Sequence, residues 1–192
     1  FLNLILYSFS KLAVAVFGAY FKVQSMAFMP VFGLNNGMIP IISYNYGAQK
    51  PDRMKRTMKL GVMVGCSIMV FCLAIMQVFP GQILKIFDAT DEMLLMGIPA
   101  VRIMSTAFIF AGFSVTCSGM FQAVGKGVYS MIVSMARQLF VILPVAYFLS
   151  KAMNSVNGVW AAFPIAEVFS VIISTIFLLR VYKKIVKPME SV

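Results

Sequence analysis

Long apolar stretches make up most of this chain, and short polar breaks separate them. The breaks include Ser8, Ser10 and Lys11 near the start, and later the sequences "FPGQ", "GKG" and "SKAMNSVNG". The pattern predicts helices at approximately 1–9, 13–48, 58–79, 93–123, 128–149 and 158–182. The last five are long enough to cross a hydrocarbon core, which takes about 20 helical residues. The alternation typical of membrane β-barrel strands is absent. We therefore predict an all-α polytopic membrane protein.

The composition agrees with a chain that lies in the lipid bilayer. Of its 192 residues, 61% are hydrophobic and only 11% are charged. A soluble domain of this size cannot bury that much apolar surface in one core. The net charge of +10 is not arranged as a basic stripe, so we expect no nucleic-acid partner. The chain has no His, and Cys66, Cys72 and Cys117 form no CxxC pair, so we expect no metal site.

The positions of Lys and Arg predict how the helices are oriented in the membrane. Two basic clusters, in 50–59 and near the C-terminus, are separated by four predicted helices and therefore share one face. The positive-inside rule places the loop 50–59 and the C-terminus in the cytoplasm, with 185–192 as a tail after a lobe at 1–184. The clusters are explained most simply as topology anchors, with lipid head-group binding as the second interpretation. Their members, with Lys126 on the same face, are Lys50, Arg53, Lys55, Arg56, Lys59, Arg180, Lys183, Lys184 and Lys187.

The segment 13–48 combines helix-breaking residues with polar side chains. Its 36 residues exceed a perpendicular span, so the helix must tilt, bend or protrude. Pro30 and Pro40 each remove a main-chain donor, so we favour a bent or discontinuous helix. Gly33 and Gly37 either join the prolines as hinge residues or, in their GxxxG spacing, let another helix approach. The polar residues should face protein or water rather than lipid. They are Asn35, Asn36, Ser43 and Asn45.

Four motifs in order resemble the second half of a multidrug and toxic compound extrusion (MATE) transporter of the bacterial multidrug branch. They are "FGLNNGMIPIISYNYGAQKPDRMKRTMKLG", "FSVTCSGMFQAVGKGVYS", "ARQLFVILPVAYFL" and "NGVWAAFPIAEVFS". The resemblance implies the C-terminal six-helix lobe, its first helix truncated, of a two-lobed twelve-helix antiporter in the bacterial inner membrane. It also implies a missing N-terminal lobe and export of drugs or toxic organic cations by alternating access. Inward movement of Na⁺ or H⁺ would drive this export, and no other cofactor is implied.

Four ionisable residues lie within the predicted spans: Lys22, Arg102, Arg137 and Glu167. The last three each lie about ten residues from a loop, which at 1.5 Å per residue puts them about 15 Å deep. We expect Glu167 to pair with Arg137 or Arg102, while Lys22 lines water. Glu167 is then either a relay for the coupling ion or one half of a permanent ion pair. By the resemblance, Lys22 matches a family lysine early in helix eight, whereas Asn3 stands where several members have an acid.

The substrate cavity should combine a soft apolar lining with a few polar groups. Sixteen Met and eighteen Phe suit bulky apolar cations, although most of them must pack or face lipid. Polar candidates for cavity-facing positions, each of which could instead bond between helices, are Gln24, Asn35, Asn36, Ser114, Ser118 and Gln122.

Two other functions remain open from the sequence. A lipid-linked saccharide flippase of the same superfold would need a cationic cavity, which Lys22, Arg102 and Arg137 could form. A non-transporting membrane scaffold would gain nothing from intramembrane charges. An enzyme is the least expected, because no His and no carboxylate pair lies in the predicted spans.

Overall fold

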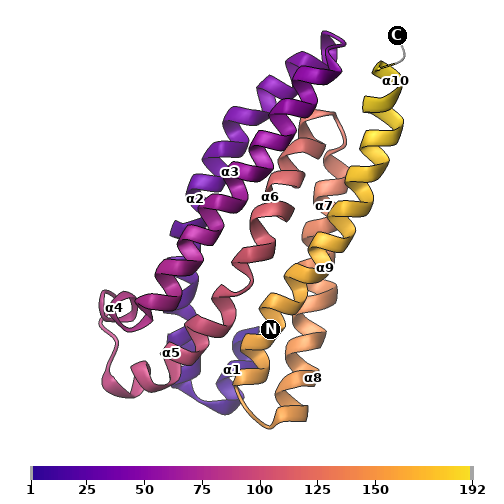
Figure 1. The fold of residues 1–192 in the computed structure, drawn as a ribbon. Helices are drawn as coiled ribbons and strands as arrows, with labels where there is room; N and C mark the ends of the chain where they lie inside the picture. Colours follow the sequence, from indigo (N-terminus) through magenta and orange to yellow (C-terminus); the bar gives the residue numbers. More distant parts are fainter. Residues whose placement is uncertain (1, 191–192) are drawn as a thin grey trace.

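Helices form nearly all of residues 2–190, the part of the chain that this computed structural model describes (Figure 1). The first residue of the predicted lobe and the last two of the predicted tail lie outside this part. The helices are α1 Leu2–Phe9, α2 Lys11–Gly47, α3 Pro51–Val78, α4 Pro80–Lys85, α5 Asp91–Ser105, α6 Phe108–Ala123, α7 Gly127–Met135, α8 Leu143–Met153, α9 Asn157–Val181 and α10 Lys187–Met189. Two π-helical segments, η1 Ala136–Ile142 and η2 Tyr182–Val186, join α7 to α8 and α9 to α10.

The helices have the lengths of membrane spans. Four continuous helical stretches in the described part are long and apolar enough to cross a bilayer, and the bent pair α5 and α6 makes a fifth when it is counted as one span. The predicted all-α membrane fold is therefore confirmed. Two helical ends extend furthest beyond the predicted spans, because apolarity marks only the part that suits lipid. The basic run after Pro51 is already helical in α3, and helical structure continues past 182 to Met189.

The helix α2 is continuous through both of its prolines, so the expected discontinuity in 13–48 is wrong. Ser10 caps its N-terminus by accepting a hydrogen bond from the Ala13 N–H. At 1.5 Å per residue its 37 residues reach about 55 Å, well beyond a hydrocarbon core of about 30 Å. The excess length extends out of the bundle as the hairpin that α2 forms with α3 (Figure 1). Membrane helices tolerate interior prolines when other groups satisfy the carbonyl that is left free, and α2 stays helical on both sides of Pro30 and Pro40.

The interruption lies instead in the predicted segment 93–123, between α5 and α6. These helices meet at Thr106 and Ala107 with a bend of 48°. The Thr106 N–H bonds to the Ile103 carbonyl, one residue closer than an α-helix requires, and this frees the Arg102 carbonyl. Gln77 of α3 donates to that carbonyl at 2.9 Å. A side chain from a neighbouring helix thus satisfies a main-chain group that the bend leaves free, as an apolar environment demands.

Glycines allow α3 and α6 to pack closely along the centre of the bundle. A Cβ on Gly112 would lie 2.9 Å from the Cα of Cys66, so the two main chains touch at this point. Gly65 of the same α3 face also meets α6. Gly33 and Gly37 differ, because a Cβ on either would have no neighbour within 4 Å in the described residues. The GxxxG interpretation of Gly33 and Gly37 as a helix contact therefore finds no support within this lobe.

The two basic clusters lie at the same end of the bundle. The α2–α3 hairpin and the end of α10 are neighbours at the top of the view in Figure 1. An ion pair of 2.8 Å joins Lys55 in α3 to Glu190 just after α10. The structure therefore confirms that the loop 50–59 and the C-terminal region lie at the same end of the bundle.

Candidate functional site

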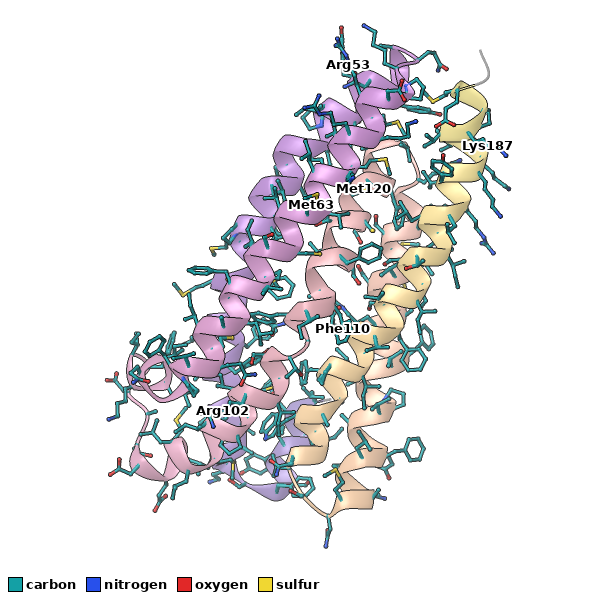
Figure 2. The ribbon with its side chains drawn as sticks, in the orientation of Figure 1. Arg53, Met63, Arg102, Phe110, Met120 and Lys187 are labelled. Atoms are coloured by element: carbon teal, nitrogen blue, oxygen red, sulfur yellow. The ribbon has the colours of Figure 1, made fainter. Side chains whose placement is uncertain are left out.

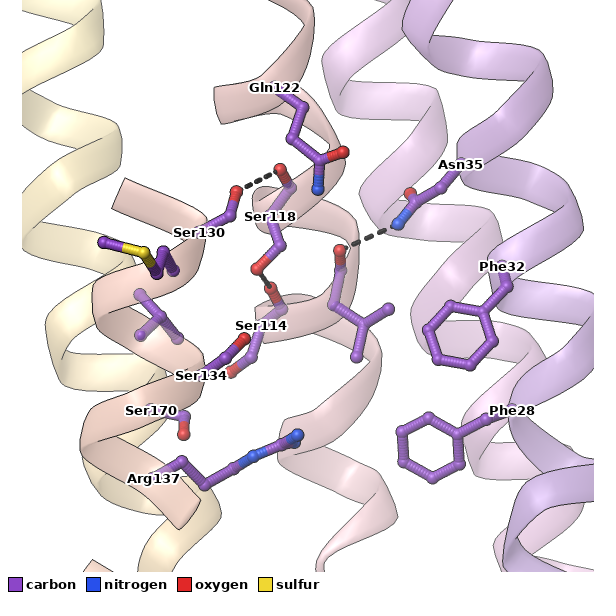
Figure 3. A pocket seen from close by; sticks show the side chains of 13 residues that line it. Phe28, Phe32, Asn35, Ser114, Ser118, Gln122, Ser130, Ser134, Arg137 and Ser170 are labelled. Atoms are coloured by element: carbon purple, nitrogen blue, oxygen red, sulfur yellow. Dashed lines mark hydrogen bonds between the residues drawn. The ribbon is translucent and has the colours of Figure 1, made fainter. Parts of the chain in front are cut away.

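A polar cavity of about 370 Å³ opens between α2 on one side and α7, η1 and α9 on the other, with α6 between them. We call it cavity 1. Figure 3 shows its side chains converging from these five elements. Four of the six predicted cavity residues line it, namely Asn35, Ser114, Ser118 and Gln122. Its other lining residues are Phe28, Phe32, Val115, Ser130, Met131, Val133, Ser134, Arg137 and Ser170.

Cavity 1 offers several hydrogen-bond acceptors beside the donors of Arg137 and Gln122. Ser118 donates to the Ser114 carbonyl, and Ser130 donates to the Ser118 carbonyl at 2.7 Å (Figure 3). Their hydroxyl hydrogens are thereby committed to the main chain, and their oxygen lone pairs remain. Asn35 donates from Nδ2 to the Val115 carbonyl at 2.9 Å, which leaves its buried Oδ1 without a partner. Such a lining suits a ligand that carries N–H donors or positive charge.

A second cavity of about 370 Å³ adjoins the first, and Phe28, Phe32 and Arg137 line both. We call it cavity 2. Gln24 and Glu167 bring it two acceptor oxygens, Oε1 and Oε2, that are buried without a hydrogen-bond partner. Its remaining lining is mostly aromatic and apolar, so it can hold the body of a hydrophobic ligand. These residues are Phe21, Ser25, Met29, Ala107, Gln138, Ile142 and Phe163.

Arg137 and Glu167 form an ion pair at the boundary between the two cavities. The Arg137 Nη1 lies 2.6 Å from the Glu167 Oε1, and only 6% of Glu167 is exposed. The sequence offered Arg137 or Arg102 as the partner of Glu167, and in the structure the partner is Arg137. Arg137 stands on the π-helical segment η1, and Pro144 just beyond that segment has no N–H to donate. Wide turns of this kind occur where a regular helix bond is missing, often at functional sites.

The other two intramembrane cations lie apart from both cavities. Lys22 is exposed, and its Nζ lies 5.9 Å from the centre of the Phe87 ring. Arg102 is exposed beside the bend between α5 and α6, as Figure 2 shows. The predicted cluster of Lys22, Arg102 and Arg137 is therefore wrong as a shared lining, because neither Lys22 nor Arg102 faces cavity 1 or cavity 2. Spacing along the chain gave their depth but not the direction of the side chains.

Asn36 is the one predicted cavity residue that lines neither cavity 1 nor cavity 2. It is exposed on α2, one residue from the buried Asn35, because neighbours in a helix point about 100° apart. Ser43 and Asn45 are the other two polar residues that were expected to avoid lipid, and both point into the lobe. Ser43 donates to the Ala123 carbonyl, and Asn45 is buried.

Several lining residues were missed from the sequence although a signal was present. The missed residues Ser130 and Ser134 precede the predicted Arg137 at intervals of four and three, which places all three on one helix face within an apolar stretch. Ser170 follows Glu167 by three residues, again on the same face. Polar residues at helical spacing therefore mark this site better than single polar residues do.

Comparison with known proteins places the chain in a family. The MatE family matches residues 1–148. The multidrug export protein MepA of Staphylococcus haemolyticus is 26% identical over 159 residues, which are 83% of this chain and 35% of that protein. The chain thus spans about a third of the length of the curated relatives it matches.

Solved structures share the fold. A MATE protein in the straight conformation superimposes with a TM-score of 0.89, at 19% identity, over 100% of this chain and 42% of that one. A multidrug resistance MATE transporter of the MOP superfamily, in its outward-facing conformation, has a TM-score of 0.88 at 19% identity, with the same coverage. The fold is that of one lobe of such a transporter. The prediction that the chain is not an enzyme is confirmed by this family, whose members are transporters, and the chain belongs to the MatE family, the multidrug and toxic compound extrusion transporters.

Proposed function

We propose that this chain is one lobe of an exporter that moves drugs or other toxic organic cations out of the cell by alternating access. The observation that carries the proposal is the pair of adjoining cavities, one rich in acceptor oxygens and one aromatic, within a MATE lobe. An amphipathic cation needs both surfaces, since its charged end requires acceptors and its body requires apolar contact. The export named for the MepA relatives is consistent with this use.

The second lobe of the proposed transporter would belong to the same protein. A cavity that opens on one side of a lobe becomes an enclosed passage only against a partner. Tagging the C-terminus in the source cell and measuring the mass tests this point. We expect a product about twice the length of this chain, and a product near 21.2 kDa would contradict it.

Coupling to inward Na⁺ or H⁺ is the finer part of the proposal. Glu167 is the carboxylate best placed for it, because it is buried, it borders cavity 2, and one of its oxygens has no partner. The competing explanation is a permanent ion pair with Arg137 that only fixes how η1 and α9 pack. Transport by Glu167→Gln separates the two, because a relay loses ion-driven transport whereas a structural pair keeps the dependence on the ion gradient.

The orientation that we propose puts the α2–α3 hairpin and the C-terminal region in the cytoplasm of a bacterial inner membrane. The support is the concentration of basic residues at this one end, which the Lys55–Glu190 pair brings together. Prolines and glycines in α2 stay candidates for movement during transport, with Pro30, Pro40, Gly33 and Gly37 as the hinge residues to test.

Dye transport tests the function as a whole. Inverted membrane vesicles with the full-length native protein should take up a cationic dye when a Na⁺ or proton gradient is imposed, and only one of the two ions should support it. Vesicles that lack the protein are the control. Absence of uptake with both gradients, together with transfer of an anionic lipid-linked sugar, would contradict the proposal in favour of a flippase. The structure gives the flippase little support, because Arg137 alone of the three cations faces the cavities and it is already paired.

A further inference from the structure

A third cavity, of about 330 Å³, lies at the end of the bundle that carries the basic clusters. We propose that this basic cavity binds the phosphate group of an anionic phospholipid. It lies where α2, the α6–α7 turn, α9 and η2 come together, away from cavities 1 and 2. Its lining residues are Tyr46, Lys126, Tyr129, Arg180, Val181, Lys184 and Ile185.

The charge of the basic cavity is uncompensated. Lys126 comes from the α6–α7 turn, Arg180 and Lys184 stand one turn apart on the continuous helix of α9 and η2, and the three surround one space. No carboxylate is among the described residues that line it. The acid that follows α10, Glu190, is engaged by Lys55 at 2.8 Å. Three cations that converge without an acid repel one another, and an anionic ligand would relieve this repulsion.

The cations are held in place by the fold rather than by flexible side chains alone. Gly125, with a φ of +72°, ends α6 in a left-handed turn, and the Lys126 N–H bonds back to the Phe121 carbonyl at 2.7 Å. The Tyr129 ring stacks on Phe177 with 4.3 Å between the ring centres. The Arg180 guanidinium lies 5.7 Å from the centre of that same Phe177 ring. The turn and the aromatic stack therefore set the spacing between Lys126 and Arg180.

The start of α7 adds to the attraction for an anion. Lys126 is the N-cap of this nine-residue helix, and no side chain caps the first N–H groups. Uncapped N–H groups and the helix dipole favour negative charge at a helix N-terminus. Tyr46 and Tyr129 contribute hydroxyl groups to the same cavity lining. The site therefore combines formal charges, a dipole and neutral donors.

A lipid fits the site better than a soluble phosphate because apolar surface runs alongside it. Val128 is 60% exposed beside Lys126, and Leu179 is 54% exposed beside Arg180. Ile132 on α7 and Ile176 on α9 continue these two exposed apolar faces away from the charged end. A phosphate in the cavity would place acyl chains along these helices, which are spans of a membrane protein. Basic pockets between membrane helices bind anionic head groups in this way.

Native mass spectrometry of the full-length protein with dioleoyl phosphatidylglycerol tests the proposal. The triple variant Lys126→Gln, Arg180→Gln and Lys184→Gln should bind this lipid on the order of 100-fold more weakly, since each basic residue contributes about fivefold. Lys184→Gln alone should weaken binding about fivefold, and it serves if the triple variant folds poorly. The matched control removes the same charge at exposed residues outside the cavity, as Arg53→Gln, Arg56→Gln and Lys59→Gln, and should bind as the native protein does.

Three results would overturn the proposal. Equal weakening in both triple variants would show a diffuse attraction to surface charge. Undiminished binding in the cavity variants would show that the lipid sits elsewhere. Displacement of the lipid by glycerol phosphate at equal concentration would make the ligand a soluble phosphate. Dye transport by the cavity variants is measured separately, so failure of the lipid site leaves the export proposal standing.

Discussion

Gln77 of α3 donates a hydrogen bond of 2.9 Å to the main-chain carbonyl of Arg102, at the bend between α5 and α6. It also reaches the Ser105 hydroxyl at 3.2 Å. The bend removes the helical partner of this carbonyl, and a side chain from another helix replaces it. The Ser105 hydroxyl donates to the same carbonyl at 3.2 Å, so a local bond and a contact between helices together hold the broken span.

Removing that side chain should destabilise the lobe. We expect Gln77→Leu to lower the free energy of unfolding by about 1 kcal/mol, because the Arg102 carbonyl then keeps only the longer bond, of 3.2 Å, from the Ser105 hydroxyl. Gln82→Leu, at an exposed position in α4, is the matched control. Thermal unfolding in detergent measures the difference, and equal effects of the two substitutions would show that the contact contributes nothing.

Close packing of α3 on α6 gives a second prediction. Gly112→Ala should lower the free energy of unfolding by about 1–3 kcal/mol, because the new Cβ would meet the Cys66 main chain at 2.9 Å. Gly33→Ala should leave stability unchanged or raise it by up to about 1 kcal/mol, because its Cβ has open space. Chemical or thermal unfolding of the two variants compares them directly. A larger loss for Gly33→Ala would contradict the packing described for these two glycines.

The Arg137–Glu167 pair should behave as a coupled unit in a double-mutant cycle. Glu167→Gln alone should cost about 3–5 kcal/mol of stability, because it leaves the Arg137 guanidinium without its carboxylate. The double variant with Arg137→Gln should recover part of that loss, because neither charge then remains unpaired. Glu92→Gln, the same change at an exposed position, is the control. Additive effects of the two single substitutions would show that the pair is not coupled.

The sequence was sufficient to predict the helices, the family and the shared end of the two basic clusters, because each depends on a pattern along the chain. The bend at Thr106 and Ala107 was missed, since its stabilising partner, Gln77, lies 25 or more residues away. Prolines are visible in a sequence, and they suggested a break in α2 that the packed helix does not have.

The residues of the candidate site likewise divide into those that the sequence could place and those that it could not. Residues at helical spacing on α6, namely Ser114, Ser118 and Gln122, were found together in cavity 1. Lys22 and Arg102 could not be placed, because their depth in the membrane is fixed by chain length whereas their direction depends on which helices pack around them. Asn35 and Asn36 were indistinguishable in the sequence, and only the rotation of α2 within the lobe separates the buried one from the exposed one.

A cationic ligand should enter cavity 1, and protection of a thiol at position 134 against labelling measures this entry. Ser134→Cys is made in the full-length protein after Cys66, Cys72 and Cys117 have been replaced by Ala, and it is labelled with a water-soluble cationic thiol reagent. A cationic dye should slow labelling at 134, while labelling of Arg56→Cys, an exposed position at the hairpin end of α3, should stay unchanged. Labelling at 134 that stays unchanged at dye concentrations saturating transport would contradict it.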